Sequence, residues 1–311
     1  MRSNRRFGIE LEFGDNDDCF LESELWKALK PAVEKASRLT GHPVGRNNPN
    51  HWVIKPEGCH QVEINTPALT KKTDAMAGLK HIENALKNLK TCPISQDCGQ
   101  HVHLDITNEQ DIHIKRLKLV IDMYYMDEYL FELVTPSRRD CDWCLPTRGF
   151  WEAFREEEGF FRGEECDSDD DECDCPSCRR CLKIRNGRLL GSDSELSRSG
   201  ERIRYYFNDK ETALSLWSNT VEFRLGGPTI KAEDAVMWAL LCRRFVDVSF
   251  RNKRKILKAN SFGQFMNVLG LDKTMRAWCL KRRRLLNGDW ESKLGKHTFG
   301  HDKFERPWTN Y

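Results

Sequence analysis

The fold is best predicted from the stretch Phe7-Gly8-Ile9-Glu10-Leu11-Glu12-Phe13, in which four apolar residues alternate without a break with Gly8, Glu10 and Glu12. Successive side chains of a β-strand point to opposite faces, so the four apolar residues share one face and the two glutamates share the other. Residues two apart on one strand lie about 6–7 Å apart along it. Two carboxylates at that separation repel each other unless a cation or a shared proton lies between them.

The same pattern recurs in three later stretches, 61–65, 101–105 and 221–225. Each places apolar residues on one face and reactive residues on the other. The reactive residues are Glu63, then His101, His103 and Asp105, and then Glu222 and Arg224. If the four strands share one antiparallel sheet, one face packs on helices and the other forms a polar floor. The sequence therefore predicts an α+β fold, with an antiparallel sheet that has a polar catalytic face and helices on its opposite face.

Helical spacing of apolar residues predicts helices over 20–40, 74–90, 109–134 and 232–250. Residues 189–202 are polar and are predicted to be mobile, and 204–208 are predicted to form a strand. The chain from 251 to about Asn287 is predicted to be helical. Its basic run, 281–284, is typical of a solvated helix face.

The composition narrows the class of protein. The chain has 311 residues, a net charge of +2 and 39% hydrophobic residues, which supports a sizeable core. No apolar run reaches transmembrane length and the N-terminus does not look like a signal peptide, so we expect a cytoplasmic protein without a membrane partner. The nearly balanced charge does not favour nucleic acid as a partner.

A cysteine-rich segment between Cys141 and Cys181 stands apart from the strands. Two Cys-x-x-Cys pairs have the spacing of a structural zinc site, and a third overlaps one of them. The candidate zinc ligands are Cys141, Cys144, Cys173, Cys175, Cys178 and Cys181. An acidic run, 164–174, lies between the pairs. We therefore expect residues 141–200 to be a zinc-stapled insertion between two parts of one domain, 1–140 and 201–311; the alternative is an acidic insert with incidental thiols.

The polar floor suggests a chemistry. Several carboxylates near an imidazole suit hard divalent cations such as Mg²⁺, which take oxygen ligands and bridge phosphates. Arg224 shares a strand face with Glu222, where its guanidinium is well placed to meet a phosphate oxygen. The combination fits phosphoryl transfer, in which positioning and charge neutralisation supply most of the catalysis.

Five motifs occur in a characteristic order. They are Gly8-Ile9-Glu10-Leu11-Glu12; residues 52–59 followed by Val62-Glu63-Ile64-Asn65-Thr66-Pro67; His101-Val102-His103; Arg204-Tyr205-Tyr206-Phe207-Asn208; and Thr220-Val221-Glu222-Phe223-Arg224 followed by Gly227 and Thr229. In this order the chain resembles the amidoligase family, carboxylate–amine ligases with a glutamine synthetase-like fold, over about residues 6–250. It departs from the family pattern at Glu57 and Cys59, where an Asp-x-Ser is usual, and in its cysteine-rich insert.

The resemblance implies an ATP-dependent ligase that forms an amide bond through an acyl phosphate. Its substrates would be a small-molecule or peptide carboxylate and an amine. The matching positions in the family's motifs imply that Arg224 would stabilise the transferred phosphoryl group and that Arg204 and Asn208 would line the nucleotide pocket. The implied Mg²⁺ ligands are Glu10, Glu12, Glu63 and Glu222, with His101 or His103 completing one site or contacting phosphate.

Three other functions compete with this interpretation. A metal-dependent hydrolase would use His101, His103 and Asp105 to hold zinc or iron and would need no ATP. A non-catalytic zinc-bearing binding protein would depend on the cysteine-rich segment and tolerate loss of Glu10 and Glu12. A protein that acts on nucleic acid is less favoured, and its binding would weaken steeply with salt.

Overall fold

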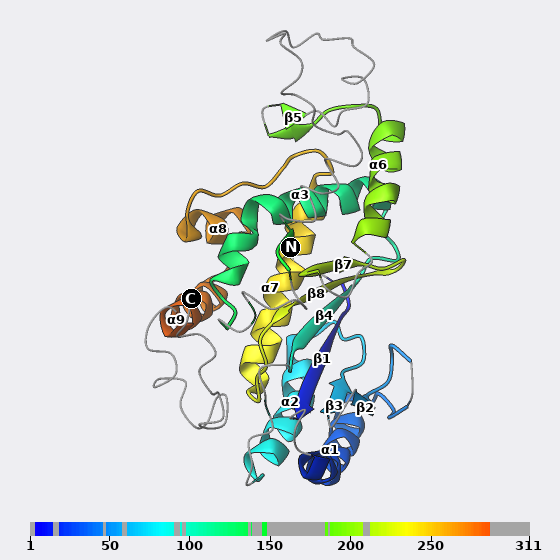
Figure 1. Ribbon diagram of the computed structural model, residues 1–311, viewed down its shortest axis with the longest axis vertical. Coiled ribbons are helices and arrows are strands. Elements are labelled where there is room, and N and C mark those ends of the chain that lie inside the picture. The colour runs from blue at the N-terminus through cyan, green and yellow to red at the C-terminus, as the bar shows by residue number, and fades with distance from the viewer. Residues whose placement is uncertain are drawn as a thin grey trace.

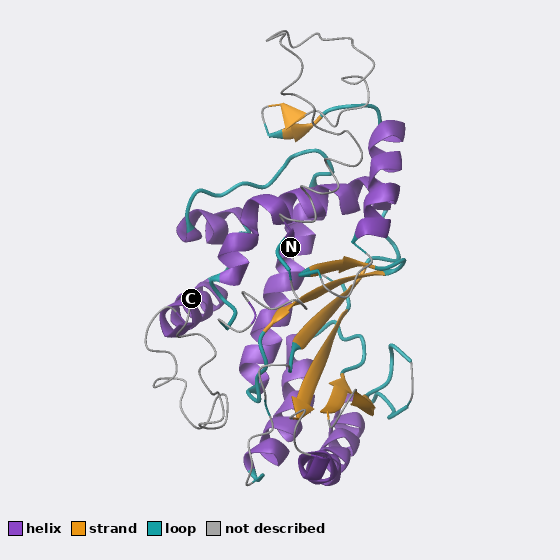
Figure 2. Cartoon of the chain, viewed as in Figure 1, coloured by secondary structure: helices purple, strands orange, loops and turns teal. Residues whose placement is uncertain are grey.

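A computed structural model of the 311-residue chain shows a mixed helix and sheet architecture (Figures 1 and 2). The structure describes residues 4–14, 19–45, 48–57, 61–89, 94, 98–135, 138, 145–147, 184–185, 187–207 and 212–286. All six candidate zinc ligands of the cysteine-rich segment lie outside these residues, as does Asn208.

A six-stranded sheet forms the centre of the described chain, with strand order β2-β3-β1-β4-β8-β7. The strands are β1 (Phe7–Gly14), β2 (Val53–Glu57), β3 (Gln61–Asn65), β4 (Gln100–Asp105), β7 (Leu214–Leu216) and β8 (Thr220–Gly226). All neighbouring pairs are antiparallel. The predicted antiparallel sheet and α+β class are therefore confirmed.

The two faces of the sheet divide as the alternation in the sequence predicts. On β1, Phe7, Ile9, Leu11 and Phe13 are buried on one face. The helices α1 (Cys19–Thr40), α2 (Lys72–Lys87) and α7 (Ala232–Arg251) pack against the sheet or against one another on this side. Phe223 of β8, for example, meets Phe245 of α7 edge-on, with ring centroids 6.2 Å apart. The polar face is thereby left to the reactive side chains.

One helix contradicts the predictions for the described part of residues 189–208. Residues 193–206 form α6 (Asp193–Tyr206), not a mobile stretch followed by a strand. Ser192 and Glu195 form a capping box at its start, in which each side chain accepts from the backbone N–H of the other residue. The helix packs against α3 (Ile112–Phe131), so closely that a Cβ at Gly200 would lie 1.8 Å from the carbonyl oxygen of His113. A short hairpin, β5 (Ile184–Arg185) and β6 (Arg188–Leu189), precedes it.

The basic run 281–284 lies in α9 (Lys273–Leu286), which follows the shorter α8 (Phe262–Val268). Arg282 donates from Nε to the carbonyl oxygen of Leu133 at 2.6 Å, and Arg283 forms an ion pair with Glu132. These contacts hold α9 on the end of α3. The prediction of a solvated face is therefore wrong for Arg282, which is largely buried, whereas the Arg283 side chain keeps 41% of its surface exposed.

A buried ion pair joins α3 to its neighbours. Lys118 and Asp122, one turn apart on α3, are fully buried and bond to each other. Asp122 also accepts from the backbone N–H of Leu257 at 2.8 Å, and the Lys118 ammonium lies 3.5 Å from Ser249 Oγ of α7. Burial raises the pKa of Asp122 to about 6, against the opposing charge of Lys118. Burial likewise lowers the pKa of Lys118.

Within the described residues, none of the helices combines the length and the apolar content that crossing a bilayer requires.

Candidate functional site

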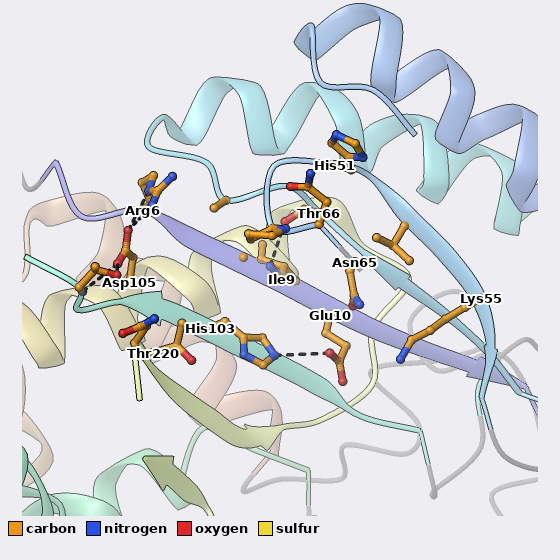
Figure 3. A pocket seen from close by; sticks show the side chains of 17 residues that line it. Arg6, Ile9, Glu10, His51, Lys55, Asn65, Thr66, His103, Asp105 and Thr220 are labelled. Atoms are coloured by element: carbon orange, nitrogen blue, oxygen red, sulfur yellow. Dashed lines mark hydrogen bonds and ion pairs between the residues drawn. The ribbon is translucent and has the colours of Figure 1, made fainter. Parts of the chain in front are cut away.

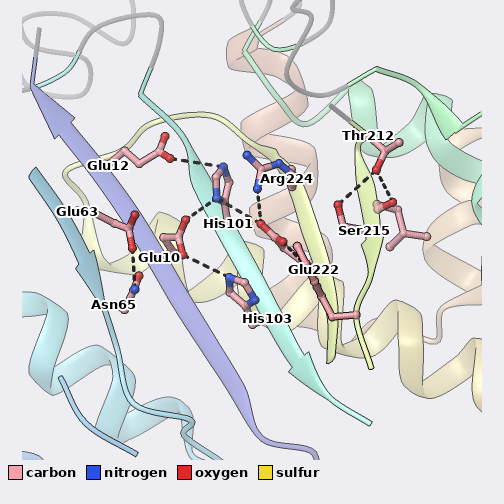
Figure 4. Close-up of polar contacts among 12 residues, drawn as sticks. Glu10, Glu12, Glu63, Asn65, His101, His103, Thr212, Ser215, Glu222 and Arg224 are labelled. Atoms are coloured by element: carbon pink, nitrogen blue, oxygen red, sulfur yellow. Dashed lines mark hydrogen bonds and ion pairs between the residues drawn. The ribbon is translucent and has the colours of Figure 1, made fainter. Parts of the chain in front are cut away.

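Four adjacent strands, β3, β1, β4 and β8, assemble a cluster of acidic and imidazole side chains on the polar face (Figure 4). The register places Glu10 opposite His101, and His103 opposite Glu222. Side chains directly opposite each other on neighbouring strands have Cβ atoms about 4.5–5.5 Å apart. Residues far apart in the sequence therefore meet here because the strands that carry them are neighbours.

Glu10 lies at the centre of this cluster. Its Oε1 is 2.7 Å from Nδ1 of His101, and its Oε2 is 3.4 Å from Nε2 of His103. The two oxygens of one carboxylate thus face two different imidazoles. Glu10 therefore contacts both histidines of the cluster.

His101 lies opposite an irregularity in β8. Gln100 pairs with Gly226 and Val102 pairs with Phe223, so β8 has two residues where β4 has only His101. Its Nδ1 is 3.5 Å from Oε1 of Glu222, and its Nε2 is 3.8 Å from Oε1 of Glu12. One imidazole therefore contacts carboxylates from both neighbouring strands.

The carboxylate of Glu222 accepts hydrogen bonds from two nearby side chains. Arg224 donates from Nη1 to its Oε1 at 2.6 Å, and the indole of Trp217 donates to its Oε2 at 2.7 Å. The Nε of Arg224 is buried and donates no hydrogen bond to any described residue. The predicted pairing of Glu222 with Arg224 is present, and Trp217 is a contributor that the strand pattern did not reveal, because it lies just beyond the end of β7.

Arg138 is a second residue that the sequence did not indicate. It is buried, and its Nη2 lies 3.9 Å from Oε2 of Glu12. Gly99 makes room for this approach: a Cβ there would lie 2.1 Å from Nη2 of Arg138 and 3.0 Å from Nε2 of His101. No periodic pattern surrounds Arg138, so only its position in space associates it with the site.

The electrostatics keep the central carboxylates ionised. Burial acts to raise the pKa of Glu10, but hydrogen bonds and charge from His101 and His103 outweigh it and hold that pKa well below its usual value. The pKa of Glu222 is lowered for the same reason, against burial, by the two imidazoles and Arg224. Burial opposes charging of His103, yet Glu10 and Glu222 raise its pKa. The site thus has ionised oxygen ligands before any cation enters.

Two groups of side chains have the spacing needed to hold cations. Glu10, Glu12 and His101 form one group, and Glu10, His103 and Glu222 form the other; in each, the ligand atoms lie within 4.8 Å of one another. Carboxylate oxygens suit Mg²⁺ and Mn²⁺, and the added imidazoles also suit transition metals. The donor set therefore fits a divalent cation in each group, with Glu10 shared.

Glu63 and Asp105 have other partners. The carboxylate of Glu63 accepts from Nδ2 of Asn65 at 2.7 Å and pairs with Nζ of Lys55 at 3.0 Å. Asp105 pairs with Arg6 at 2.6 Å and accepts from Thr107. Neither belongs to the two cation-holding groups found among the described residues. The set His101, His103 and Asp105, on which a hydrolase would depend, is thus not gathered at one point.

Arg204 occupies the last turn of α6, where its guanidinium lies 5.1 Å from the ring centroid of Tyr205. Its charge lowers the pKa of Arg116 on α3, after the larger effect of burial. Arg116 in turn donates to the carbonyl oxygens of Trp217 and Ser218. Arg204 therefore lies on the β7–β8 side of the site, while the bonds to the carboxylate cluster come from Arg224 and Trp217.

Glu63 gives a pH-dependent expectation. Burial and the charge of Glu10 raise its pKa from 4.5 to about 7, against Lys55 and Asn65. A raised pKa means that the folded chain binds this proton more tightly than the unfolded chain does. The contribution to stability is therefore present below pH 4.5 and is lost as the pH rises towards 7. We therefore expect the unfolding free energy of Glu63→Gln to fall less than that of the wild type between roughly pH 5 and pH 8. Urea denaturation at a series of pH values, without divalent cations, measures this difference.

The exposed Glu24→Gln on α1 is the matched control for this measurement and should leave the pH dependence unchanged. An identical pH dependence in wild type and Glu63→Gln would show that the Glu63 carboxyl titrates normally.

Comparison with known proteins adds to this geometry. A protein family described as "Putative amidoligase enzyme" matches residues 3–246, which include all the strands of the sheet and every residue of the carboxylate–imidazole cluster. No curated protein matches the chain. The match covers most of the chain and confirms the resemblance that the five motifs indicate. The chain belongs to the amidoligase family, a family of ligase enzymes.

Proposed function

We propose that the protein is an ATP-dependent carboxylate–amine ligase that forms an amide bond through an acyl phosphate. The observation that carries the proposal is the shared position of Glu10 in two cation-holding groups, directly beside the Glu222–Arg224 pair. Paired divalent cations and a guanidinium are the groups that phosphoryl transfer requires. Membership of a ligase family supports the same chemistry.

Each residue of the cluster has a role in this reaction. Glu10, Glu12, Glu222, His101 and His103 would hold Mg²⁺, which supplies neutralisation of the phosphate charge when bound. Arg224 would place its guanidinium on the transferring phosphoryl oxygens. Trp217 and Arg224 orient Glu222, and Arg138 approaches Glu12 from the other side.

The proposed reaction has two steps. An oxygen of the substrate carboxylate attacks the γ-phosphorus of ATP, and the bond from that phosphorus to ADP breaks. The amine nitrogen then attacks the acyl carbon, the carbon–oxygen bond to phosphate breaks, and inorganic phosphate leaves with that electron pair. The nitrogen loses a proton, and the products are an amide, ADP and phosphate.

Further parts of the proposal rest on the family and on the composition. We propose a glutamine synthetase-like fold, a nucleotide pocket near Arg204 and Asn208, and Glu63 as a further Mg²⁺ ligand. We also propose structural Zn²⁺ in the cysteine-rich insertion 141–200. Cys242 and Cys279 are buried free thiols, which supports a reducing, cytoplasmic location.

Arg224→Lys tests the proposal. The substitution keeps the charge but loses the planar fork that matches phosphoryl oxygens. We expect turnover to fall by roughly 10²-fold, about 2.7 kcal/mol of barrier, with a smaller change in ATP affinity. The assay is ADP release with pools of carboxylates and amines, together with the product mass, which should be one water below the sum of the two substrates.

The matched control is Arg198→Lys, on the exposed side of α6, which should turn over as the wild type does. Equal ADP release from Arg224→Lys and wild type would remove Arg224 from the reaction. Cleavage of an amide without ATP consumption would instead establish the metal-dependent hydrolase.

A further inference from the structure

A cavity of about 410 Å³ opens on the polar face next to Glu10 and His103 (Figure 3). Its walls come from β2, β3, β1 and β4, from the loop that includes Asn48 and His51, and from the start of β8. Glu10 and His103 line it, whereas Glu222 and Arg224 do not. The cavity therefore borders the cation-holding cluster on the side away from Arg224.

Gly8 opens this cavity. It lies on the same face of β1 as Glu10, directly opposite His103, and lines the cavity wall. A Cβ at this position would lie 3.8 Å from the carbonyl oxygen of Thr66 and 3.9 Å from Cβ of His103, which are ordinary contacts. A side chain would therefore fit the fold, and its absence leaves space beside the cluster.

One end of the cavity offers hydrogen-bond acceptors. Asn65 is the register partner of Glu10 across β1 and β3, so their side chains are neighbours. The amide of Asn65 is oriented by Glu63, whose Oε1 accepts from both Asn65 Nδ2 and Lys55 Nζ. The Asn65 Oδ1 is buried and accepts from no group among the described residues. An unpaired acceptor beside an ionised carboxylate suits a donor that carries positive charge.

The remaining charges of the cavity are balanced within the chain. Lys55 pairs with Glu63, and Arg6 pairs with Asp105, although the Arg6 side chain keeps 47% of its surface exposed. Among the described residues that line it, the cavity thus offers the partly exposed guanidinium of Arg6 but no unpaired cation for the several charges of a triphosphate. The exposed part of Arg6 leaves one positive group at the opposite end from Glu10, where a carboxylate of the ligand can be met.

We infer that the cavity over Gly8 binds the amine substrate, a primary amine of amino-acid or dipeptide size. Its nitrogen lies at Glu10 and Asn65, and its carboxylate points towards Arg6. The inference rests on the proposed ligase activity and deepens it by naming the class of the nucleophile. The bound ammonium gives one proton to water before the nitrogen attacks the acyl carbon, and the bond changes are otherwise those given above.

Saturation-transfer NMR with two probes tests the inference without any nucleotide. Glycylglycine carries the free amine, and N-acetylglycylglycine lacks it. We expect glycylglycine to bind at least about tenfold more tightly, since the acetyl group removes the charged donor. Equal binding of both probes, or binding of neither, would overturn the assignment to an amine.

Substitutions at two positions locate the binding. Gly8→Leu fills the cavity and should weaken glycylglycine binding at least about tenfold, and Gly8→Ala should weaken it less. Asn65→Ala removes the unpaired acceptor and should weaken it about tenfold. The matched controls are Gly263→Leu and Asn260→Ala, both at exposed positions in or beside α8, which should bind as the wild type does. Unfolding curves of all variants verify that each is folded.

The outcomes separate the two proposals. One result is that the wild type releases ADP with amines while Gly8→Leu and Asn65→Ala bind glycylglycine normally. That result would support the ligase proposal and contradict the assignment of the cavity to the amine. If glycylglycine binding depends on both residues but no nucleotide is consumed, the cavity binds amines and the ligase proposal falls.

Discussion

Glu10→Gln is expected to lower turnover by about 10³-fold or more, which corresponds to about 4 kcal/mol of barrier. Glu10 belongs to both groups of cation ligands, so one substitution removes an ionised oxygen ligand from each of them. The carboxamide is neutral and binds a hard cation far less well than a carboxylate does. The substitution also removes the negative charge that raises the pKa of His103. The measurement is the initial rate of ADP formation over a series of Mg²⁺ concentrations.

Glu12→Gln is the comparison that makes this result specific. Glu12 belongs to only one of the two groups. We therefore expect a fall of roughly 10- to 10²-fold that excess Mg²⁺ partly restores, whereas Glu10→Gln should not be restored. Equal losses in the two variants would argue against a shared role for Glu10, and full activity in both would remove the cluster from the reaction.

The second large effect is expected on stability, at the buried ion pair of α3. Lys118→Met leaves the carboxylate of Asp122 buried without its cation, and breaking a buried pair in this way costs about 3–5 kcal/mol of unfolding free energy. The additional change Asp122→Asn should recover much of that loss. It removes the charge, while the amide oxygen can still accept from the N–H of Leu257.

Urea denaturation of the two single variants and the double variant measures this coupling. Lys80→Met supplies the control. Lys80 is exposed, and its partner Glu83, although buried, keeps Lys87 as a second cation, so the loss should be less than about 1 kcal/mol. Additive losses for Lys118→Met and Asp122→Asn would show that the two side chains are not coupled.

The strand pattern predicted much of the site because a period of two reports the face on which a side chain lies. Glu10, Glu12, His101, His103 and Glu222 do share one face, as the alternation requires. The pattern carries no information on strand order or register. It therefore could not reveal that Glu10 lies between two imidazoles, or that Glu63 is paired with Lys55 and Asn65.

The residues that escaped prediction lie where no periodicity operates. Trp217 and Arg138 follow the ends of β7 and α3, and only tertiary structure brings them to the carboxylates. The stretch 204–208 favours a strand by its aromatic residues, a weak preference that context overrides. The capping box at Ser192 and the packing of Leu196 and Ile203 stabilise a helix there instead.

The strand order has a consequence for how the chain folds. Within the six-stranded sheet, the pairings β2–β3 and β7–β8 join segments that are close in sequence. In contrast, β1 pairs with β4 through Phe7 and Leu104, and β4 pairs with β8 through Val102 and Phe223. Loop-closure entropy must be lost before such distant pairings stabilise the chain, and folding slows as contact order rises. Hairpins and helices are thus expected to form early, and the strands that carry Glu10, His101 and Glu222 to meet late. A cation that needs all three strands then has affinity only for the nearly complete fold, and its binding free energy adds to the stability of that state alone.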